Sequence, residues 1–393
     1  MSRYVLSKRF VVICASLNRI LLAVQKIHIE QFLLLANEHP VLDVRSPVEY
    51  KQAHIPGAYS LPLFTDEERK IVGTTYKQQS REDAIKIGLD FFGPKMRRMV
   101  EEVEALIAGR WTIVYNNNTQ RTSAIVLIHC WRGGMRSAAI AWLLDLYGFK
   151  VYTLIGGYKV YRNEVLNVFK QSYELKILGG YTGSGKTLLL KALEKKGEKV
   201  IDLESIACHK GSAFGAIGQH PQPTQEMFEN LLSQELRKKS INGEGSCSPI
   251  WLEDESQRIG LVNIQPAFWN TMRQSPVCFI DIPFEERLDH VVECYGKLDK
   301  EKLVHAIVRI GKRLGGLETK TAIHFLLEDN TRECFRILLK YYDKYYRKGL
   351  LNREKGDELI NTIACEKVDV EINVQLVLAH LQVEMATNIL KNE

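Results

Sequence analysis

The 393-residue sequence lacks any apolar run of about 18 or more residues, the length that a membrane-spanning helix requires. Its eight cysteines include no CxxC pair, which argues against a zinc site and against a disulfide framework. Neither sign of charge dominates strongly, since the net charge is only +6. This charge permits phosphorylated or nucleic-acid ligands without indicating either. We therefore expect a cytoplasmic chain with no membrane contact, long enough for two or three domains.

Residues 1–25 are expected to form an N-terminal extension. FVVICASL follows three basic residues, as the core of a signal peptide would, but Asn18 and Arg19 interrupt the pattern. No small-residue cleavage site follows clearly. An extra amphipathic helix or an early start codon is the interpretation we favour.

The segment VLIHCWRGGMRSAAI predicts a buried strand, a cysteine loop and an alanine-rich helix. Cys130 would lie where loop amides and the positive end of a helix favour anions and lower the pKa of a thiol. Arg132 and Arg136 strengthen both effects, and the two glycines between them let the backbone surround an oxyanion. The C-x5-R spacing is shared by persulfide-forming sulfurtransferases and cysteine phosphatases. A buried structural cysteine before a helix is the alternative interpretation.

A second motif, LDVRSPVEYKQAHIPGAYSLPL, precedes the cysteine loop. It contains Asp43, Arg45, Glu49 and His54 at spacings that a strand and a turn alone do not explain. Together with the cysteine loop, the motif resembles a rhodanese domain. The resemblance implies an α/β fold of parallel strands with helices on both faces, which we place at residues 26–165.

The string GGYTGSGKT follows a hydrophobic strand and precedes a leucine-rich helix, the context that a P-loop requires. Its glycines permit a nest of N–H groups around a di- or triphosphate, its lysine adds a positive charge, and its threonine hydroxyl can hold Mg²⁺. The predicted phosphate-binding residues are Gly180, Gly183, Gly185, Lys186 and Thr187. We expect a P-loop NTPase-like domain at residues 173–298, the alternative being a chance occurrence of the string.

Two further predicted strands, KVIDLES and IWLEDES, end in carboxylates. In a P-loop fold, carboxylates at strand ends face the phosphate site and can ligate Mg²⁺ or orient water. The candidates are Asp202, Glu204, Glu253 and Glu255. Any one of them could instead cap a helix. Arg287, in the helix that follows VCFIDIP, could clamp a phosphate or lie on the surface, and the sequence leaves these alternatives equal.

Helical periods dominate residues 299–393, which we expect to form a helical C-terminal region. The stretch RILLKYYDKYYRKGLLNREK interleaves tyrosines with lysines and arginines. Because basic residues meet phosphates and aromatic rings stack on unpaired bases, Arg347, Lys348 and Arg353 are predicted to contact single-stranded RNA. An amphipathic helix with packed tyrosines and solvated lysines is an equal alternative.

Five strings, CWRGGMRS, GGYTGSGKT, HKGSAFGAIG, QPTQEMFEN and WLEDESQRIG, occur in this order and resemble the tRNA 2-selenouridine synthase family. The resemblance implies a transferase acting on tRNA that carries 2-thiouridine at the wobble position. Such an enzyme geranylates the sulfur from geranyl diphosphate and then replaces it with selenium from selenophosphate. It further implies that Cys130 forms an S-selanylcysteine intermediate and that the P-loop holds a diphosphate. We expect a monomer that depends on a supply of selenophosphate.

One loop departs from the family pattern. In LESIACHKGSAFG, Ser205, Ile206, Cys208 and Lys210 stand where relatives would carry Gly, Leu, Asn and Arg, which leaves the fine specificity of this loop open. A rival hypothesis is a P-loop kinase or NTPase fused to a sulfur-carrying or phosphatase-like rhodanese domain. Such an enzyme would hydrolyse ATP without RNA. A non-catalytic RNA-binding protein is a third hypothesis.

Overall fold

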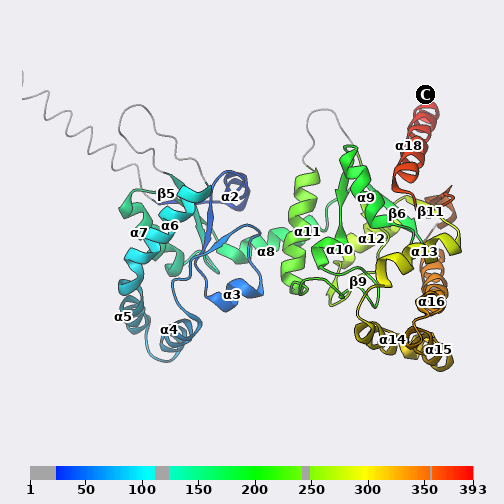
Figure 1. Cartoon of the computed structure of the whole chain (residues 1–393). Coiled ribbons are helices and arrows are strands. Elements are labelled where there is room, and N and C mark those ends of the chain that lie inside the picture. Colours follow the sequence, from blue (N-terminus) through cyan, green and yellow to red (C-terminus); the bar gives the residue numbers. More distant parts are fainter. Residues whose placement is uncertain (1–23, 111–123, 241–247, 355, 393) are drawn as a thin grey trace, which may run out of the picture. The chain divides into compact units, whose positions relative to one another are not determined.

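The computed structural model describes residues 24–110, 124–240, 248–354 and 356–392. Nearly all of the predicted N-terminal extension lies outside these residues. The chain divides into two compact units, Met1–Leu166 and Asn167–Glu393 (Figure 1). None of the described helices has the length and apolarity needed to span a bilayer.

The first unit contains a five-stranded sheet in which every pair of neighbouring strands is parallel. The strands, in spatial order, are β1 (Gln25–Ile27), β5 (Lys150–Leu154), β4 (Ile125–His129), β2 (Val41–Asp43) and β3 (Tyr59–Ser60). The central strand β4 reads IVLIH and is buried almost throughout, as expected for a strand with both faces covered.

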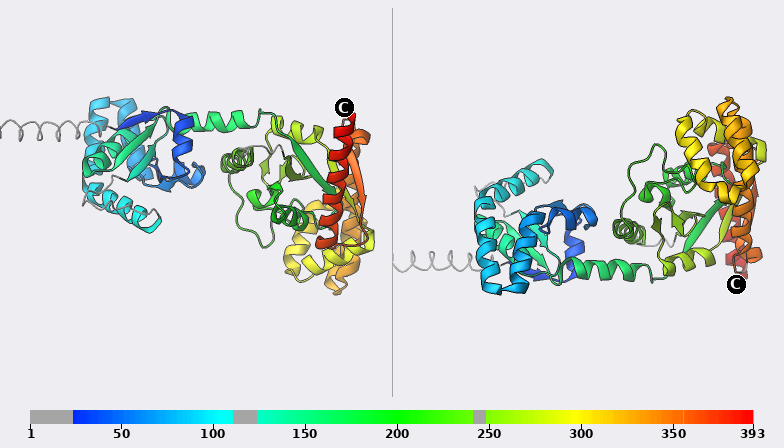
Figure 2. Two further views of the ribbon diagram at one scale, coloured as in Figure 1. Left: turned by 90° about the horizontal axis from the view of Figure 1, so that it is seen from above. Right: turned by 90° about the horizontal axis from the view of Figure 1, so that it is seen from below.

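Helices of the first unit connect these strands and cover the sheet (Figures 1 and 2). They are α2 (Ile29–Leu35), α3 (Pro47–Gln52), α4 (Asp66–Gln78), α5 (Arg81–Phe92), the 3₁₀ turn η1 (Gly93–Lys95), α6 (Met96–Arg110), α7 (Met135–Tyr147) and α8 (Gly157–Val168). Val103 of α6 and Ile140 and Leu144 of α7 are fully buried in the same core as Val126 and Ile128 of β4. This packing fixes the start of α7 against the end of β4.

The second unit contains another five-stranded, all-parallel sheet. Its strands, in spatial order, are β12 (Ile360–Ala364), β11 (Val277–Asp281), β6 (Leu175–Gly180), β8 (Ile250–Glu253) and β7 (Lys199–Ile201). A separate antiparallel pair joins β9 (Arg258–Ile259) to β10 (Val262–Asn263). The two parallel sheets confirm the predicted α/β class.

Ten described helices accompany this sheet. They are α9 (Lys186–Lys195), α10 (Leu203–Ala207), α11 (Gln225–Ser240), α12 (Pro266–Gln274), α13 (Phe284–Tyr295), α14 (Lys300–Leu314), α15 (Gly316–Leu327), α16 (Thr331–Leu351), α17 (Gly356–Leu359) and α18 (Val370–Asn392). Leu303, Ala322 and Leu338 bring α14, α15 and α16 into one apolar cluster. The expected helical region is therefore present, but it is not entirely helical.

The difference is β12, which lies within the predicted helical region and pairs in parallel with β11. Its sequence, INTIA, is only five residues long, so the longer helical periods on either side obscured it. Ile363 of β12 packs with Leu190 of α9 and Val377 of α18 in one core cluster. Pairing with β11 along all five residues, together with the burial of Ile363, accounts for the strand.

Candidate functional site

Cys130 lies in the loop between β4 and α7. The amide of Tyr158 donates to the Cys130 carbonyl at 2.8 Å, and that of Lys159 donates to the Trp131 carbonyl at 3.0 Å. Gly133 has φ +68°, and a Cβ there would lie 2.6 Å from the Leu154 carbonyl oxygen. Glycine is thus required by both the backbone conformation and the space. The loop is held close to the start of α8.

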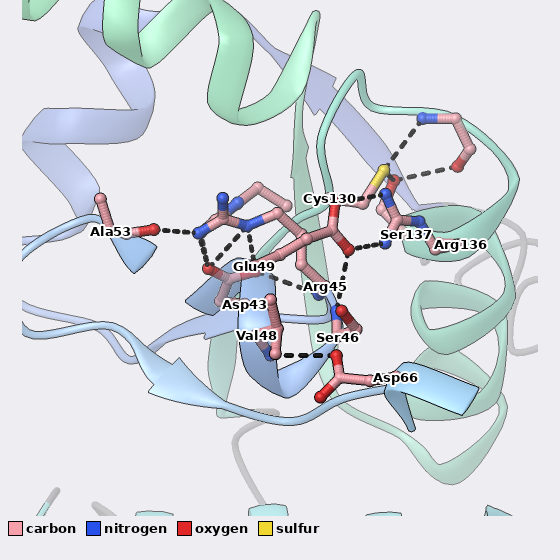
Figure 3. A network of polar contacts seen from close by, with 12 residues as sticks. Asp43, Arg45, Ser46, Val48, Glu49, Ala53, Asp66, Cys130, Arg136 and Ser137 are labelled. Carbon is pink, nitrogen blue, oxygen red and sulfur yellow. Dashed lines mark hydrogen bonds and ion pairs between the residues drawn. The ribbon is translucent and has the colours of Figure 1, made fainter. Parts of the chain in front are cut away.

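The thiol of Cys130 is only 3% exposed and is surrounded by hydrogen-bonding groups (Figure 3). Its Sγ lies 3.3 Å from the Ser137 hydroxyl and accepts from the Gly134 amide at 3.3 Å. Burial opposes ionisation of the thiol, but hydrogen bonds from Ser137, Gly134 and Arg132 outweigh it and lower the pKa of Cys130. The thiolate, which is the nucleophilic form, is therefore favoured.

The two arginines predicted to assist this thiol differ in their contacts. Arg136 forms a bidentate pair with Glu49, with N–O distances of 2.5 and 3.2 Å, so its guanidinium is directed at a carboxylate of α3 (Figure 3). Glu49 also accepts from the Ser46 amide at 3.0 Å and completes a capping box. The charge of Arg136 is therefore paired with a carboxylate of the protein, and its predicted effect on the thiol and on anions stays a prediction. Arg132 has an exposed side chain and contributes its backbone amide to Cys130.

The rhodanese-like motif supplies a buried scaffold beside the cysteine loop. Arg45 donates to both carboxylate oxygens of Asp43 at 2.6 to 3.0 Å and to the Ala53 carbonyl at 2.7 Å. The Arg45 guanidinium also lies 3.8 Å from the ring centre of Tyr158, whose amide holds the cysteine loop. These contacts position the loop and leave Asp43 and Arg45 without access to a substrate.

The P-loop connects β6 to α9, in the strand-to-helix context that the sequence predicts. Gly183 has φ +84°, and a Cβ there would lie 2.8 Å from the Arg287 carbonyl oxygen. Lys186 donates from Nζ to the Gly180 carbonyl at 2.8 Å, and the Thr187 hydroxyl donates to Glu204 at 3.2 Å. The Lys186 ammonium thus reaches back to the first residue of the loop, and the Thr187 hydroxyl is directed at a carboxylate.

Tyr346 of α16 fixes the first residue of the P-loop. Its hydroxyl accepts from the Gly180 amide at 3.0 Å and donates to Asp254 at 2.8 Å. Sequence reasoning grouped Tyr346 with RNA-stacking tyrosines and did not single out Asp254. The i, i+3 spacing from Asp343 to Tyr346 places both on one face of the helix and is the signal that was available.

Arg287 holds the next part of the P-loop. It is 3% exposed, donates to the Thr182 carbonyl at 2.9 Å, and pairs with Asp343 of α16 at 2.7 Å. Neither a surface position nor a free phosphate clamp describes this arrangement. Arg287 supports the phosphate site through the loop backbone.

Three of the four predicted carboxylates meet beside Thr187. One oxygen from each of Glu204, Glu253 and Glu255 lies within 4.8 Å of the others. Asp202 instead caps α10 by accepting from the Ser205 amide at 2.8 Å, which was the alternative interpretation.

The environment of these three carboxylates suits a cation. Glu253 is buried, and its Oε1 has no hydrogen-bond partner among the described residues. Burial, followed by the charges of Glu204 and Glu255, raises the pKa of Glu253 well above its ordinary value. Burial and the charge of Glu204 likewise raise the pKa of Glu255 to about 8. Closely spaced oxygen ligands that resist simultaneous ionisation fit Mg²⁺, which would neutralise them.

The three residues predicted to contact tRNA do not share one environment. Arg347 and Lys348 are exposed on α16, consistent with a surface that can meet phosphates. Arg353 is 5% exposed, pairs with Asp254, and donates to the Met272 and Arg273 carbonyls at 3.2 Å. Its assignment as a tRNA contact is therefore wrong, because its charge is already neutralised inside the protein.

Comparisons with known proteins cover both units. The family model described as tRNA 2-selenouridine synthase AAA domain matches residues 173–369, and the rhodanese-like domain model matches residues 28–164. A tRNA 2-selenouridine synthase from Bdellovibrio bacteriovorus is 39% identical over 260 residues, which cover 65% of this chain and 64% of the relative. The chain thus spans slightly less than two thirds of that relative's length.

Other relatives with the same name match over longer stretches. The protein from Serratia proteamaculans is 37% identical over 70% of this chain and 74% of its own length. The protein from Sulfurovum sp. is 32% identical over 80% of this chain and 89% of its own length. These matches span the cysteine loop unit and the P-loop unit in the order described above. The chain therefore belongs to the tRNA 2-selenouridine synthase family.

Proposed function

We propose that this chain converts 2-thiouridine at the wobble position of tRNA to 2-selenouridine through an S-geranylated intermediate. The observation that supports this most strongly is the presence, in one chain, of a buried cysteine with a lowered pKa and a P-loop beside three carboxylates. Family membership supplies the substrate class. The protein would act as a cytoplasmic monomer supplied with selenophosphate.

The P-loop unit is proposed to perform the first step with geranyl diphosphate. A thiocarbonyl sulfur is a poor leaving group, whereas an S-alkylated sulfur departs as a neutral thiol, so alkylation activates C2 of the base. The loop amides and Lys186 would bind the diphosphate and stabilise it as it leaves the geranyl carbon. Thr187, Glu204, Glu253 and Glu255 would hold Mg²⁺, which supplies charge neutralisation to a diphosphate when bound.

The cysteine unit is proposed to perform the second step. Cys130 would receive selenium from selenophosphate and hold it as S-selanylcysteine, a covalent intermediate that divides one difficult substitution into two. Selenium in selenophosphate is at the selenide level, so forming the S–Se bond with release of phosphate needs a two-electron oxidant of the disulfide class. After selenium has displaced the geranylthiol from C2, a thiol would cleave the S–Se bond, return the two electrons as a disulfide forms again, and release 2-selenouridine. The Gly134 amide and the exposed Arg132 would hold the anionic donor, and the Ser137 hydroxyl would stabilise the thiolate.

Two substitutions in the full chain test this division of labour. In a strain that lacks the native enzyme, Cys130→Ala should accumulate geranylated 2-thiouridine and yield no 2-selenouridine, because alkylation needs no protein nucleophile. Lys186→Ala should yield neither product. Mass spectrometry of tRNA nucleosides measures both. Normal 2-selenouridine in the Cys130→Ala strain would overturn the covalent role, and phosphate release from ATP without tRNA would instead support the NTPase hypothesis.

A further inference from the structure

An open pocket of about 460 Å³ lies beside the P-loop in the second unit. Its lining residues are Tyr181, Phe284, Arg287, Asp343, Lys344 and Arg347. The volume falls within the range of roughly 300 to 1,000 Å³ typical of small-ligand sites. The pocket adjoins the phosphate-binding loop directly, because Tyr181 is a residue of that loop.

In this pocket, one guanidinium group lies over two aromatic rings. The Arg287 guanidinium carbon lies 4.9 Å from the ring centre of Tyr181 and 5.5 Å from that of Phe284. Arg287 is itself held by Asp343 and by the Thr182 carbonyl. Unpaired bases stack on such aromatic and guanidinium planes with little dependence on base identity.

The rim of the pocket carries positive charge that the protein does not neutralise. Lys344 and Arg347 are exposed, and within the described part of the chain neither forms an ion pair, whereas the charge of Arg287 is matched by Asp343. Two unpaired cations favour an anion at the rim. A purely hydrocarbon ligand is disfavoured, because it would remove the charges of Lys344 and Arg347 from water without replacing their interactions.

We propose that this pocket binds one unpaired nucleotide, with its base on Tyr181 and Phe284 and its phosphate at Lys344 and Arg347. The nucleotide could belong to the RNA substrate, an assignment that rests on the proposed function. A free nucleotide has the same base and phosphate and would bind in the same way. Since Tyr181 belongs to the P-loop, the bound base lies next to the group that the loop holds. The pocket would therefore present a base to the phosphate site.

Binding of a fluorescent stem-loop RNA to the full-length protein tests the proposal. Phe284→Leu keeps apolar volume but removes the ring, and should weaken binding at least about fivefold, the lower end of the cost of losing one stacked base. Arg347→Gln should make the plot of log affinity against log salt less steep by about 0.7, the value for one lost single-strand phosphate contact.

Lys340→Gln is the matched control, because Lys340 is an exposed cation of the same helix that does not line the pocket. It should leave affinity nearly unchanged, and a fully paired RNA should be bound equally by wild type and Phe284→Leu. If Lys340→Gln lost as much affinity for the stem-loop RNA as Arg347→Gln, the pocket proposal would be overturned in favour of a diffuse basic surface. Unchanged RNA binding in both Phe284→Leu and Arg347→Gln would also overturn the proposal.

A second binding experiment uses uridine monophosphate in place of the stem-loop RNA. If wild type binds the mononucleotide and both pocket variants bind it less, the pocket is a nucleotide site even if the stem-loop does not bind. That result would count against the proposed RNA substrate, not against the pocket. The opposite result is that the pocket variants bind the stem-loop RNA and uridine monophosphate as tightly as wild type does. The pocket proposal then fails, and the proposed function stands.

Discussion

Four arginines near the two candidate sites direct their guanidinium groups at carboxylates of the protein itself. The pairs are Arg45 with Asp43, Arg136 with Glu49, Arg287 with Asp343, and Arg353 with Asp254. A paired guanidinium positions backbone well but attracts a ligand anion weakly, because its charge is already neutralised. Affinity for anionic substrates therefore depends on loop amides and on cations, such as Arg132 and Lys186, that have no carboxylate partner among the described residues.

The hydrogen bond between the Ser137 hydroxyl and the Cys130 thiol makes a testable contribution to thiol reactivity. Ser137→Ala removes it and should move the pH profile of Cys130 alkylation upward by roughly one pH unit, the equivalent of one hydrogen bond of about 1.4 kcal/mol. Mass spectrometry of the Cys130 peptide after timed iodoacetamide treatment measures the profile. Arg136→Gln, which loses the pair with Glu49, should shift it little. A larger shift in Arg136→Gln than in Ser137→Ala would support the effect on the thiol that the sequence predicts for Arg136.

Protons on the carboxylate cluster should compete with Mg²⁺. The pKa of Glu255 is raised to about 8, so its carboxyl holds a proton at neutral pH that a metal must displace. Affinity for Mg²⁺ should therefore increase as pH rises from about 6.5 to 8.5, with proton release on binding. Calorimetry in buffers of different ionisation enthalpy measures both. Glu255→Gln should bind Mg²⁺ more weakly and with a flatter pH dependence, and an identical pH dependence would exclude Glu255 as a ligand.

Among the secondary-structure elements, α16 combines two roles. Asp343 holds the P-loop through its ion pair with Arg287, and Tyr346 holds it directly through the Gly180 amide. Lys344 and Arg347 of the same helix are exposed. A change in the position of this helix would therefore alter both the phosphate site and the basic surface. The helix couples the two features mechanically.

The hydroxyl of Tyr346 should contribute measurably to this coupling. Tyr346→Phe leaves the Gly180 amide without its partner and should lower the free energy of unfolding by about 1 to 2 kcal/mol. Tyr345→Phe is the control, because the Tyr345 ring is 43% exposed and lies one residue away on α16. Urea denaturation compares the two. Equal effects would show that the Gly180 contact does not stabilise the loop.

Sequence reasoning located the short, local parts of both sites and missed those that depend on distant contacts. The P-loop and the cysteine loop are predictable because each is one strand, one loop and one helix. The contact between Gly180 and Tyr346 joins residues 166 positions apart, which no local pattern reveals. Arg353 was misassigned for the same reason, since its partner Asp254 lies 99 positions away. β12 was missed because its conformation depends on pairing with β11, a strand about 80 residues earlier in the chain.

On the scale of the whole chain, each unit has its own parallel sheet, its own apolar core and its own candidate site. Cys130 and its hydrogen-bond partners all belong to the first unit. The P-loop, the carboxylate cluster and α16 all belong to the second. Damage to one site should therefore leave the other chemically competent.

Mixing two inactive variants tests this independence. Geranylated tRNA is a stable covalent product, so Lys186→Ala protein should complete the reaction on tRNA that Cys130→Ala protein has geranylated. The mixture should form 2-selenouridine, whereas each variant alone should not. Nucleoside mass spectrometry measures the product over time. A mixture that geranylates tRNA but forms no 2-selenouridine would indicate that the intermediate must pass between the sites of one chain.

The position of β12 at the edge of the second sheet has a consequence for biosynthesis. All strands of the first sheet lie between Gln25 and Leu154, so that sheet can assemble while the ribosome is still translating the remainder. β11, by contrast, must wait for α13 to α17 to emerge before β12 covers its outer edge. During this interval the nascent chain exposes the backbone of an apolar strand, VCFID, which is a template for intermolecular pairing. Premature termination before Ile360 should consequently yield aggregates, and chaperone demand should concentrate on the second half of translation.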